Sequence, residues 1–150
     1  MIEVTGDLWD YHQKHGFICC ITTNGFLKRN GEAVMGAGCA KEAVKIHPRL
    51  PWILGSHILN NGNTVGWLLP TNSILDSLIA FPVKHKWWQK ADIFLIKQSS
   101  RQLANIAKNN LALTFLLPRP GCGNGGLRWK DVKKEIKDIL SISNVMVITK

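Results

Sequence analysis

The stretch Pro118-Arg119-Pro120-Gly121-Cys122-Gly123-Asn124-Gly125-Gly126-Leu127 decides how the rest of the chain is interpreted. It lies between an apolar run, 111–117, which we predict to be a strand buried on both faces, and a segment, 129–140, with the apolar spacing of a helix. Four of the six residues from Gly121 to Gly126 are glycine, so few side chains can hold a ligand away from the backbone. Exposed N–H groups in such a turn, together with the start of the next helix, can bind an anion such as phosphate. The stretch therefore predicts an anion-binding loop, with a simple glycine-rich turn as the alternative.

The same stretch also satisfies the Gly-x-Gly-x-x-Gly pattern of dinucleotide-binding folds, from Gly121 to Gly126. That fingerprint requires a following strand with an acidic residue about 20 positions later, and more of the sheet beyond it. Too little sequence follows, up to Lys150, to supply both features. We therefore do not expect a Rossmann fold.

A second glycine-rich turn, Val34-Met35-Gly36-Ala37-Gly38-Cys39-Ala40, precedes a predicted helix over 39–46. We expect this helix to end before Pro48, because proline disfavours a helical conformation in the residue before it. Two such loops at the carboxyl ends of sheet strands can bind one diphosphate from both sides. The sequence thus predicts one cleft formed by two loops that are far apart in the chain.

The remaining pattern alternates strands with helices and contains no internal repeat. We predict strands over 1–4, 16–22, 64–69, 75–81 and 145–148, and a helix over 92–109. The first two strands are expected to be neighbours, and 64–69 is expected to pair with 75–81 as a hairpin. This order indicates an α/β fold over residues 1–150, a single domain with a sheet covered by helices in layers.

The composition is that of a globular protein with a basic balance. Hydrophobic residues make up 45% of the chain and charged residues 19%, and the formal net charge is +9. This charge favours anionic partners such as nucleotides or nucleic acid, although the lysines of 130–137 also fit the solvated face of a helix. No apolar run approaches the ~20 residues of a membrane span, and the first residues do not resemble a signal peptide. We therefore expect a cytoplasmic protein with no membrane partner.

The cysteines and histidines do not form a metal-binding pattern. Cys19, Cys20, Cys39 and Cys122 contain no Cys-x-x-Cys pair, and the five histidines are scattered. We expect reduced thiols, no metal and no cofactor. Adjacent Cys19 and Cys20 should point to opposite faces of their strand.

Four motifs together resemble the macrodomain family, whose members bind ADP-ribose. In chain order they are Val4-Thr5-Gly6-Asp7-Leu8, Val34-Met35-Gly36-Ala37-Gly38-Cys39-Ala40, Phe81-Pro82-Val83-Lys84 and Gly121-Cys122-Gly123-Asn124-Gly125-Gly126-Leu127-Arg128-Trp129. The resemblance covers the whole chain. It is nearest to the DNA ADP-ribosylglycohydrolase antitoxin macrodomains of the DarG type and to the terminal ADP-ribose protein glycohydrolases. It implies a three-layer α/β/α macrodomain with a central mixed sheet.

The resemblance also implies where ADP-ribose would lie. Asp7, followed by Leu8, would accept a hydrogen bond from the adenine amino group, since a carboxylate only accepts; a helix cap is the other interpretation of Asp7. Asn24 would lie near the distal ribose. The first loop, facing that ribose and its phosphate, would contribute Gly36, Ala37, Gly38 and Cys39. The second loop, around the diphosphate, would contribute Pro118, Gly121, Cys122, Gly123, Asn124, Gly125 and Gly126.

Lys84 is the catalytic residue that the resemblance implies, next to the anomeric carbon of the distal ribose. It would attack the ring-opened sugar as an amine or stabilise developing charge. Attack requires a neutral amine, so its pKa would have to be lowered by burial or by a nearby cation, and Lys86, His85 and Lys90 are close in sequence. A solvated lysine in a basic run is the alternative interpretation. Beside it, Trp87 and Trp88 are candidates for stacking on a base or for the core.

One departure from the family pattern concerns the second loop. The protein-glycohydrolase branch carries a catalytic aspartate there, whereas this chain has Asn124-Gly125-Gly126, the same sequence as the DarG type. Three functions remain open. The chain is an ADP-ribosyl hydrolase acting on a nucleobase or a protein side chain, a phosphatase of ADP-ribose 1''-phosphate, or a non-catalytic reader of ADP-ribose marks.

Overall fold

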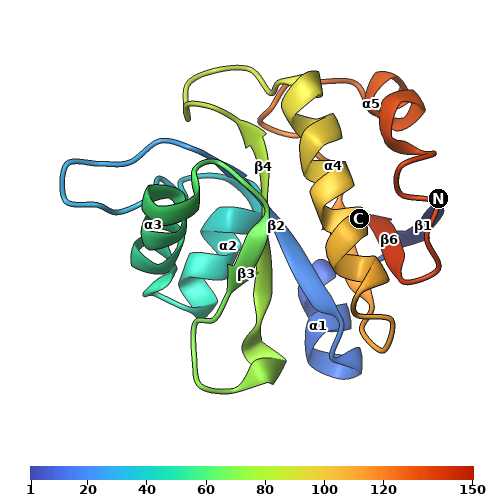
Figure 1. The fold of residues 1–150 in the computed structure, drawn as a ribbon, viewed down its shortest axis with the longest axis horizontal. Helices are drawn as coiled ribbons and strands as arrows, with labels where there is room; N and C mark the ends of the chain where they lie inside the picture. Colours follow the sequence, from blue (N-terminus) through green and yellow to red (C-terminus); the bar gives the residue numbers. More distant parts are fainter.

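The computed structural model describes residues 1–150 and consists of one six-stranded sheet between two layers of helices (Figure 1). The strand order is β1-β6-β5-β2-β4-β3, and every neighbouring pair is parallel except β3 and β4. The elements in chain order are β1 (Ile2–Thr5), α1 (Leu8–His15), β2 (Ile18–Asn24), α2 (Gly38–Ile46), α3 (Leu50–Asn61), β3 (Gly66–Leu68), the 3-10 helix η1 (Ile74–Asp76), β4 (Leu78–Lys84), α4 (Ile93–Lys108), β5 (Phe115–Pro118), α5 (Trp129–Ile136) and β6 (Val145–Thr149). The predicted α/β/α architecture with a central mixed sheet is confirmed.

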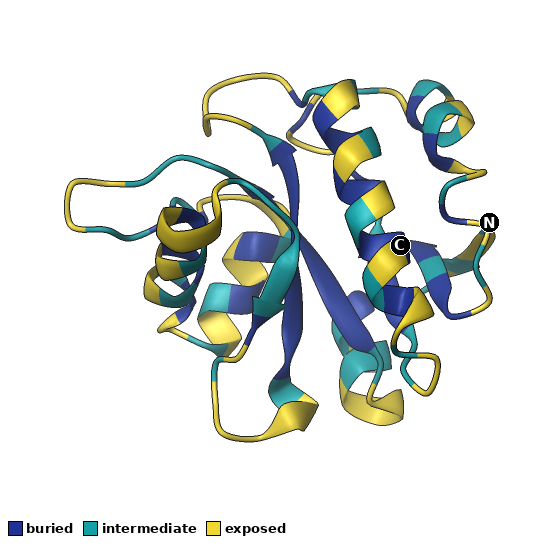
Figure 2. Ribbon diagram, viewed as in Figure 1, coloured by how far each residue is buried: buried dark blue, intermediate teal, exposed yellow.

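Each face of the sheet is covered by its own hydrophobic cluster (Figure 2). Helices α1, α2 and α3 pack on one face through residues such as Leu54, and α4 and α5 pack on the other through residues such as Leu103. Cys19 and Cys20 belong to different clusters, which confirms that they point to opposite faces. The central strands are buried on both sides, and this explains why their sequences are apolar without alternation.

The predicted hairpin is present, but several element boundaries differ from the prediction. β3 and β4 pair antiparallel, with Trp67 opposite Ile79. β4 begins three positions later than expected, because residues 74–76 form the 3-10 helix η1, which the Ser73 side chain caps. β5 likewise begins at Phe115, after a turn in which the Leu113 N–H donates to the Asn110 carbonyl oxygen (3.0 Å).

The expectation that the first two strands are neighbours is wrong. β1 pairs with β6, with Ile2 opposite Met146, at the edge of the sheet. Both edges of β2 are already occupied, one by β4 and the other by β5, so no position beside it remains for β1. The first and last strands of the described chain are therefore adjacent in space (Figure 1).

Two helices were not predicted from the sequence. α1 begins at the cap residue Asp7 and ends at Gly16, which adopts a left-handed conformation (φ 66°). α3 buries Leu50, Leu54 and Ile58, which recur at every fourth position along one stripe. Neither these two helices nor the other three have the length and apolar character needed to cross a membrane.

Candidate functional site

A cleft of about 800 Å³ opens at the carboxyl ends of the parallel strands. It lies at a topological switch point of the sheet, because the strands that follow β2 are placed on both sides of it, β4 on one side and β5 on the other. Open α/β sheets bind their ligands at such a point, and the volume is typical of small-molecule sites. The walls come from segments far apart in sequence: the turn after β1, the end of β2, the 34–40 loop, the end of β4 and the 118–125 loop.

The first glycine loop presents unpaired backbone donors to the cleft. The N–H groups of Gly36, Ala37, Gly38 and Cys39 donate to no protein acceptor, and α2 begins at Gly38 without a side-chain cap. Gly38 has φ +59°, where a side chain would be strained, whereas a Cβ built on Gly36 meets no atom within 4 Å. The loop is thus open towards the cleft and rich in fixed positive dipole ends.

The second loop has the same character but is held more tightly. The Leu127 N–H donates to the Gly121 carbonyl oxygen (2.9 Å), and the Ala91 N–H donates to the Gly125 carbonyl oxygen (2.9 Å). A Cβ on Gly125 would lie 2.5 Å from the Gly121 carbonyl oxygen, so this position has no room for a side chain. The N–H groups of Gly123, Asn124 and Gly125 have no protein acceptor. Three successive free N–H groups on a fixed turn suit an anion.

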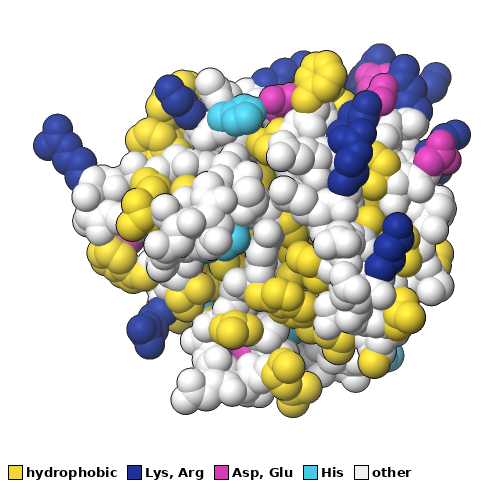
Figure 3. All heavy atoms as spheres, in the orientation of Figure 1, with side chains coloured by type: hydrophobic (Ala, Val, Ile, Leu, Met, Phe, Trp, Pro, Cys, Tyr) yellow, Lys and Arg dark blue, Asp and Glu magenta, His cyan; other side chains and the backbone are white.

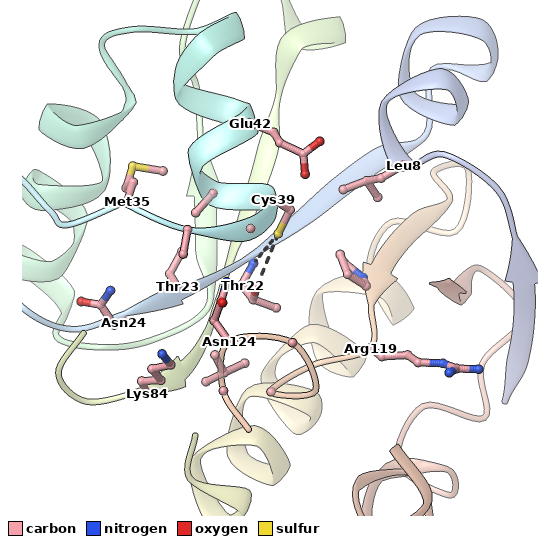
Figure 4. A pocket seen from close by; sticks show the side chains of 18 of the residues that line it. Leu8, Thr22, Thr23, Asn24, Met35, Cys39, Glu42, Lys84, Arg119 and Asn124 are labelled. Atoms are coloured by element: carbon pink, nitrogen blue, oxygen red, sulfur yellow. Dashed lines mark hydrogen bonds between the residues drawn. The ribbon is translucent and has the colours of Figure 1, made fainter. Parts of the chain in front are cut away.

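The two loops meet across the cleft. A Cβ on Gly38 would lie 3.7 Å from the Asn124 side-chain nitrogen, which is ordinary van der Waals contact. Figure 4 shows Asn124 opposite Cys39, below the start of α2. Free N–H donors from both loops therefore line the same cleft.

Asp7 caps a helix and also lines the cleft. Its Oδ1 accepts the N–H groups of Trp9 (2.9 Å) and Asp10 (3.1 Å), so it caps α1. Its Oδ2 has no protein donor, and the residue lines the cleft with Leu8. The cap therefore fixes the carboxylate while leaving one oxygen free to accept a hydrogen bond.

Asn24 lines the cleft, but its side chain is engaged in local structure. Its Nδ2 donates to the Val34 carbonyl oxygen (3.0 Å), and its Oδ1 accepts from the Phe26 N–H (3.0 Å). These bonds tie the end of β2 to both ends of the 26–34 loop. The residue thus holds the wall of the cleft in place.

Lys84 is the last residue of β4 and is half-buried at the cleft wall. Its Nζ donates only to the Trp87 carbonyl oxygen (3.4 Å), and Figure 4 shows the side chain beside Asn24 and Asn124. The nearby basic side chains His85 and Lys86 have other partners. His85 lies 2.8 Å from the Asp92 carboxylate, and the Lys86 ammonium lies 5.4 Å from the Trp88 ring centroid.

The cysteine of the first loop is a neutral thiol. The Cys39 sulfur lies 3.4 Å from both the backbone nitrogen and the hydroxyl oxygen of Thr22. Burial raises the pKa of this thiol, although the hydrogen bonds from Thr22 oppose the shift. Cys39 therefore contributes shape and packing, not a thiolate nucleophile.

Most of the residues expected in the site line the cleft, and two do not. The Cys122 side chain packs against the cluster beneath α4 and α5, and Gly126 turns the chain away with φ +76°. Several other residues that line the cleft are absent from the predicted site: Thr22, Thr23, Met35, Glu42 and Arg119. Met35 and Arg119 belong to the two predicted loops but were given no role, whereas Trp87, a candidate for stacking, lines the cleft. Arg119 points away from the cleft in Figure 4, with its guanidinium 5.1 Å from the Trp129 ring centroid.

Comparison with known proteins gives a consistent result at the level of structure. No protein-family model and no curated protein sequence matches the chain. The macrodomain of Mycobacterium tuberculosis DarG matches with a TM-score of 0.77 and 20% identity over 99% of this chain and 97% of that one. The macrodomain of Thermus aquaticus DarG matches with a TM-score of 0.74 and 22% identity over 99% and 96%.

The chain has a macrodomain fold. A third match is Thermosipho africanus DarTG in complex with ADP-ribose, with a TM-score of 0.73 and 20% identity. The present chain spans 40% of that longer chain, and 96% of its own residues are matched. At these identities the likeness concerns the fold alone, and what the chain binds is inferred from its own cleft.

Proposed function

We propose that this macrodomain binds ADP-ribose in the cleft between its two glycine loops. The observation that carries the proposal is the two sets of free N–H groups facing each other, at Gly36–Cys39 and Gly123–Gly125. A diphosphate is an anion with acceptor oxygens on both sides, and fixed backbone donors compensate it without the cost of ordering long side chains. The free Oδ2 of Asp7 then accepts from the adenine amino group, and the distal ribose lies towards Lys84.

Calorimetric titration of ADP-ribose into the protein tests this, with AMP and NAD as comparison ligands. Gly36→Glu places a carboxylate among the donors at a position with open space, so we expect binding at least about 100-fold weaker. Gly36→Ala is the matched control, since it adds a Cβ without charge, and it should bind within a few-fold of the original. Absence of saturable ADP-ribose binding in the millimolar range would refute the proposal.

We further propose that the macrodomain hydrolyses the bond between ADP-ribose and its carrier, with Lys84 as the catalytic residue. Water supplies the oxygen that joins the anomeric carbon, the bond to the carrier breaks, and the departing atom takes a proton. The Lys84 amine can attack the ring-opened sugar to form an imine that water then cleaves, or its ammonium can stabilise charge on the departing group. Borohydride trapping separates the two, because only the imine leaves a reduced adduct on Lys84.

An aromatic row at the mouth of the cleft favours a nucleobase as the carrier. Trp88 is 55% exposed, its ring centroid lies 5.3 Å from that of Phe26 and 5.4 Å from that of Trp87, and Lys86 lies over it. Aromatic faces with adjacent cations stack bases of single-stranded nucleic acid, at about 1–3 kcal/mol per base. Trp88→Ala should therefore reduce turnover of an oligonucleotide carrying ADP-ribose on a base by roughly 5- to 150-fold. The same change should not alter turnover of an ADP-ribosylated protein or affinity for free ADP-ribose.

A non-catalytic reader remains the second candidate, because the catalytic end of the cleft lacks a carboxylate. The two acidic residues of the lining are Asp7 and Glu42, and Figure 4 shows Glu42 on the opposite side of the cavity from Lys84. The reader hypothesis requires that Lys84→Ala leave ADP-ribose affinity intact and that neither protein release ADP-ribose faster than the uncatalysed rate. The hydrolase hypothesis requires release by the original protein and its loss in Lys84→Ala.

A further inference from the structure

The backbone at Lys84 is held by residues outside the glycine loops. Lys84 ends β4, where the edge strand β3 no longer pairs with it, since the last β3 contact pairs Gly66 with Ala80. The partner strand β2 also shifts its register between Thr23 and Asn24, so that Asn24 pairs with Lys84 across an irregularity. The regular sheet pattern is therefore interrupted at the residue that carries the catalytic amine.

Two N–H donors from distant segments hydrogen-bond to the backbone carbonyl oxygens at this end of β4. The Asn63 Nδ2 donates to the Lys84 carbonyl oxygen (2.9 Å), and the Gly25 N–H donates to the next carbonyl oxygen, that of His85 (3.1 Å). Gly25 also lies directly against the Asn63 side chain. A Cβ on Gly25 would lie 2.7 Å from the Asn63 Cγ, so a residue without a side chain is required there for the amide to reach Lys84.

Asn63 is itself fixed from two sides. It follows Gly62, which ends α3 with φ +75°, and the next carbonyl oxygen, that of Thr64, lies 2.8 Å from the His57 ring nitrogen. The Val65 N–H donates to the Gln102 side chain on α4 (3.0 Å). Asn63 Oδ1 is buried without a hydrogen-bond partner, an arrangement that native proteins seldom keep. The bond from Nδ2 to Lys84 is therefore the one hydrogen bond that this amide makes.

We infer that Asn63, with Gly25 as the position that admits it, is the positioning residue for Lys84. This inference rests on the proposed hydrolase function. The lysine ammonium makes a single long hydrogen bond, to the Trp87 carbonyl oxygen (3.4 Å), so the direction of the side chain depends largely on the backbone at Lys84. A reacting group displaced by about 1 Å can lose roughly 100-fold in rate, which makes a fixed backbone at this point a catalytic requirement.

The test compares Asn63→Ala and Asn63→Asp with the matched control Asn60→Ala. Asn60 is an exposed asparagine three positions earlier whose amide bonds only within its own helix, to the Ser56 carbonyl oxygen (2.9 Å) and hydroxyl oxygen (3.3 Å). Both Asn63 variants lose the donor to Lys84, and Asn63→Asp keeps the shape while facing a carbonyl oxygen with a carboxylate. We expect kcat to fall by roughly 10- to 100-fold in both, with ADP-ribose affinity unchanged within about 3-fold, and no change in Asn60→Ala.

A second comparison excludes a merely structural role. In a Lys84→Ala background, Asn63→Ala should cause no further loss of the residual rate, because its effect acts through Lys84. Thermal unfolding of each variant identifies the temperature range in which all are folded, and the rates are compared there. An equal loss with and without Lys84, or an unchanged kcat in Asn63→Ala, would overturn the inference. Absence of turnover in the original protein would instead show that the proposed function has failed.

Discussion

The two glycines at Gly123 and Gly125 look equivalent in sequence, but the structure predicts opposite results when each is replaced by alanine. A Cβ on Gly125 would lie 2.5 Å from the Gly121 carbonyl oxygen and 2.8 Å from the Ala91 Cβ, both parts of rigid backbone or its first side-chain atom. A Cβ on Gly123 meets nothing within 4 Å, and its φ is not positive. Overpacking costs about 1–3 kcal/mol, whereas a compatible Gly→Ala change stabilises by about 0.4–1 kcal/mol.

Urea unfolding measures this difference directly. We expect Gly125→Ala to lose about 2 kcal/mol in the free energy of unfolding, which corresponds to a midpoint lower by roughly 1 M urea and a Tm lower by about 4–8 °C. Gly123→Ala should unfold at the same urea concentration as the original protein or slightly above it. Equal midpoints for the two variants would refute the reasoning, because that reasoning depends entirely on the space around each Cβ.

Two further predictions concern the scaffold. Asn144→Ala should cost about 1–3 kcal/mol in unfolding free energy, because the buried Nδ2 donates to the carbonyl oxygens of Ala107 (2.9 Å), Asn110 (3.2 Å) and Leu113 (3.0 Å). The control Asn109→Ala, at an exposed amide, should stay within about 0.5 kcal/mol, and a similar loss in both variants would contradict this account. The hydrogen bond from His85 holds the pKa of Asp92 below its ordinary value. The Asp92 carboxylate therefore stabilises the fold fully above its unfolded-state pKa of ~3.9, and this stabilisation is lost as pH falls through the lower folded-state pKa. Asp92→Asn should therefore be less stable than the original near pH 6 and equally stable at the acid end of a pH series of unfolding curves; a gap that does not close at low pH would contradict the assignment.

The sequence predicted those parts of the fold and of the cleft in which a residue type is present for one physical reason. The glycine loops and the apolar strands predicted the position of the cleft and the layered fold, since glycine density and unbroken apolar runs each report a local requirement. The pairing of β1 with β6 could not be predicted in this way, because it depends on which sheet edges remain free after β4 and β5 have paired with β2. α1 was not predicted, although Asp7 and Gly16 mark its ends. Its apolar stripe is weak, since Leu8 is its one buried residue.

The Lys84 end of the cleft shows a similar limit. Lys84 was predicted from its motif, yet two residues that the structure brings to its backbone have no motif: Asn63, which donates to its carbonyl oxygen, and Gly25, which lies against the Asn63 amide. Lys86 was expected to act on Lys84 because it is near in sequence, but in space it lies over Trp88. Proximity along a chain that turns after β4 does not predict proximity of side chains. Figure 3 likewise shows Lys and Arg gathered over the region of α5, in keeping with the solvated helix face that the lysine spacing suggested.

The place of β6 between β1 and β5 has a consequence for how the protein matures. β1 has no other neighbour in the sheet, and the Gly6 N–H at the edge of the cleft donates to the Thr149 carbonyl oxygen (2.8 Å). During synthesis, residues 2–7 therefore have no strand to pair with until residues 145–149 have emerged from the ribosome. Pairing across this separation is entropically slow, so we expect closure of the sheet edge to be a late step in folding. A nascent chain stopped before residue 145 would carry both glycine loops and Lys84 and still lack the wall that positions Asp7.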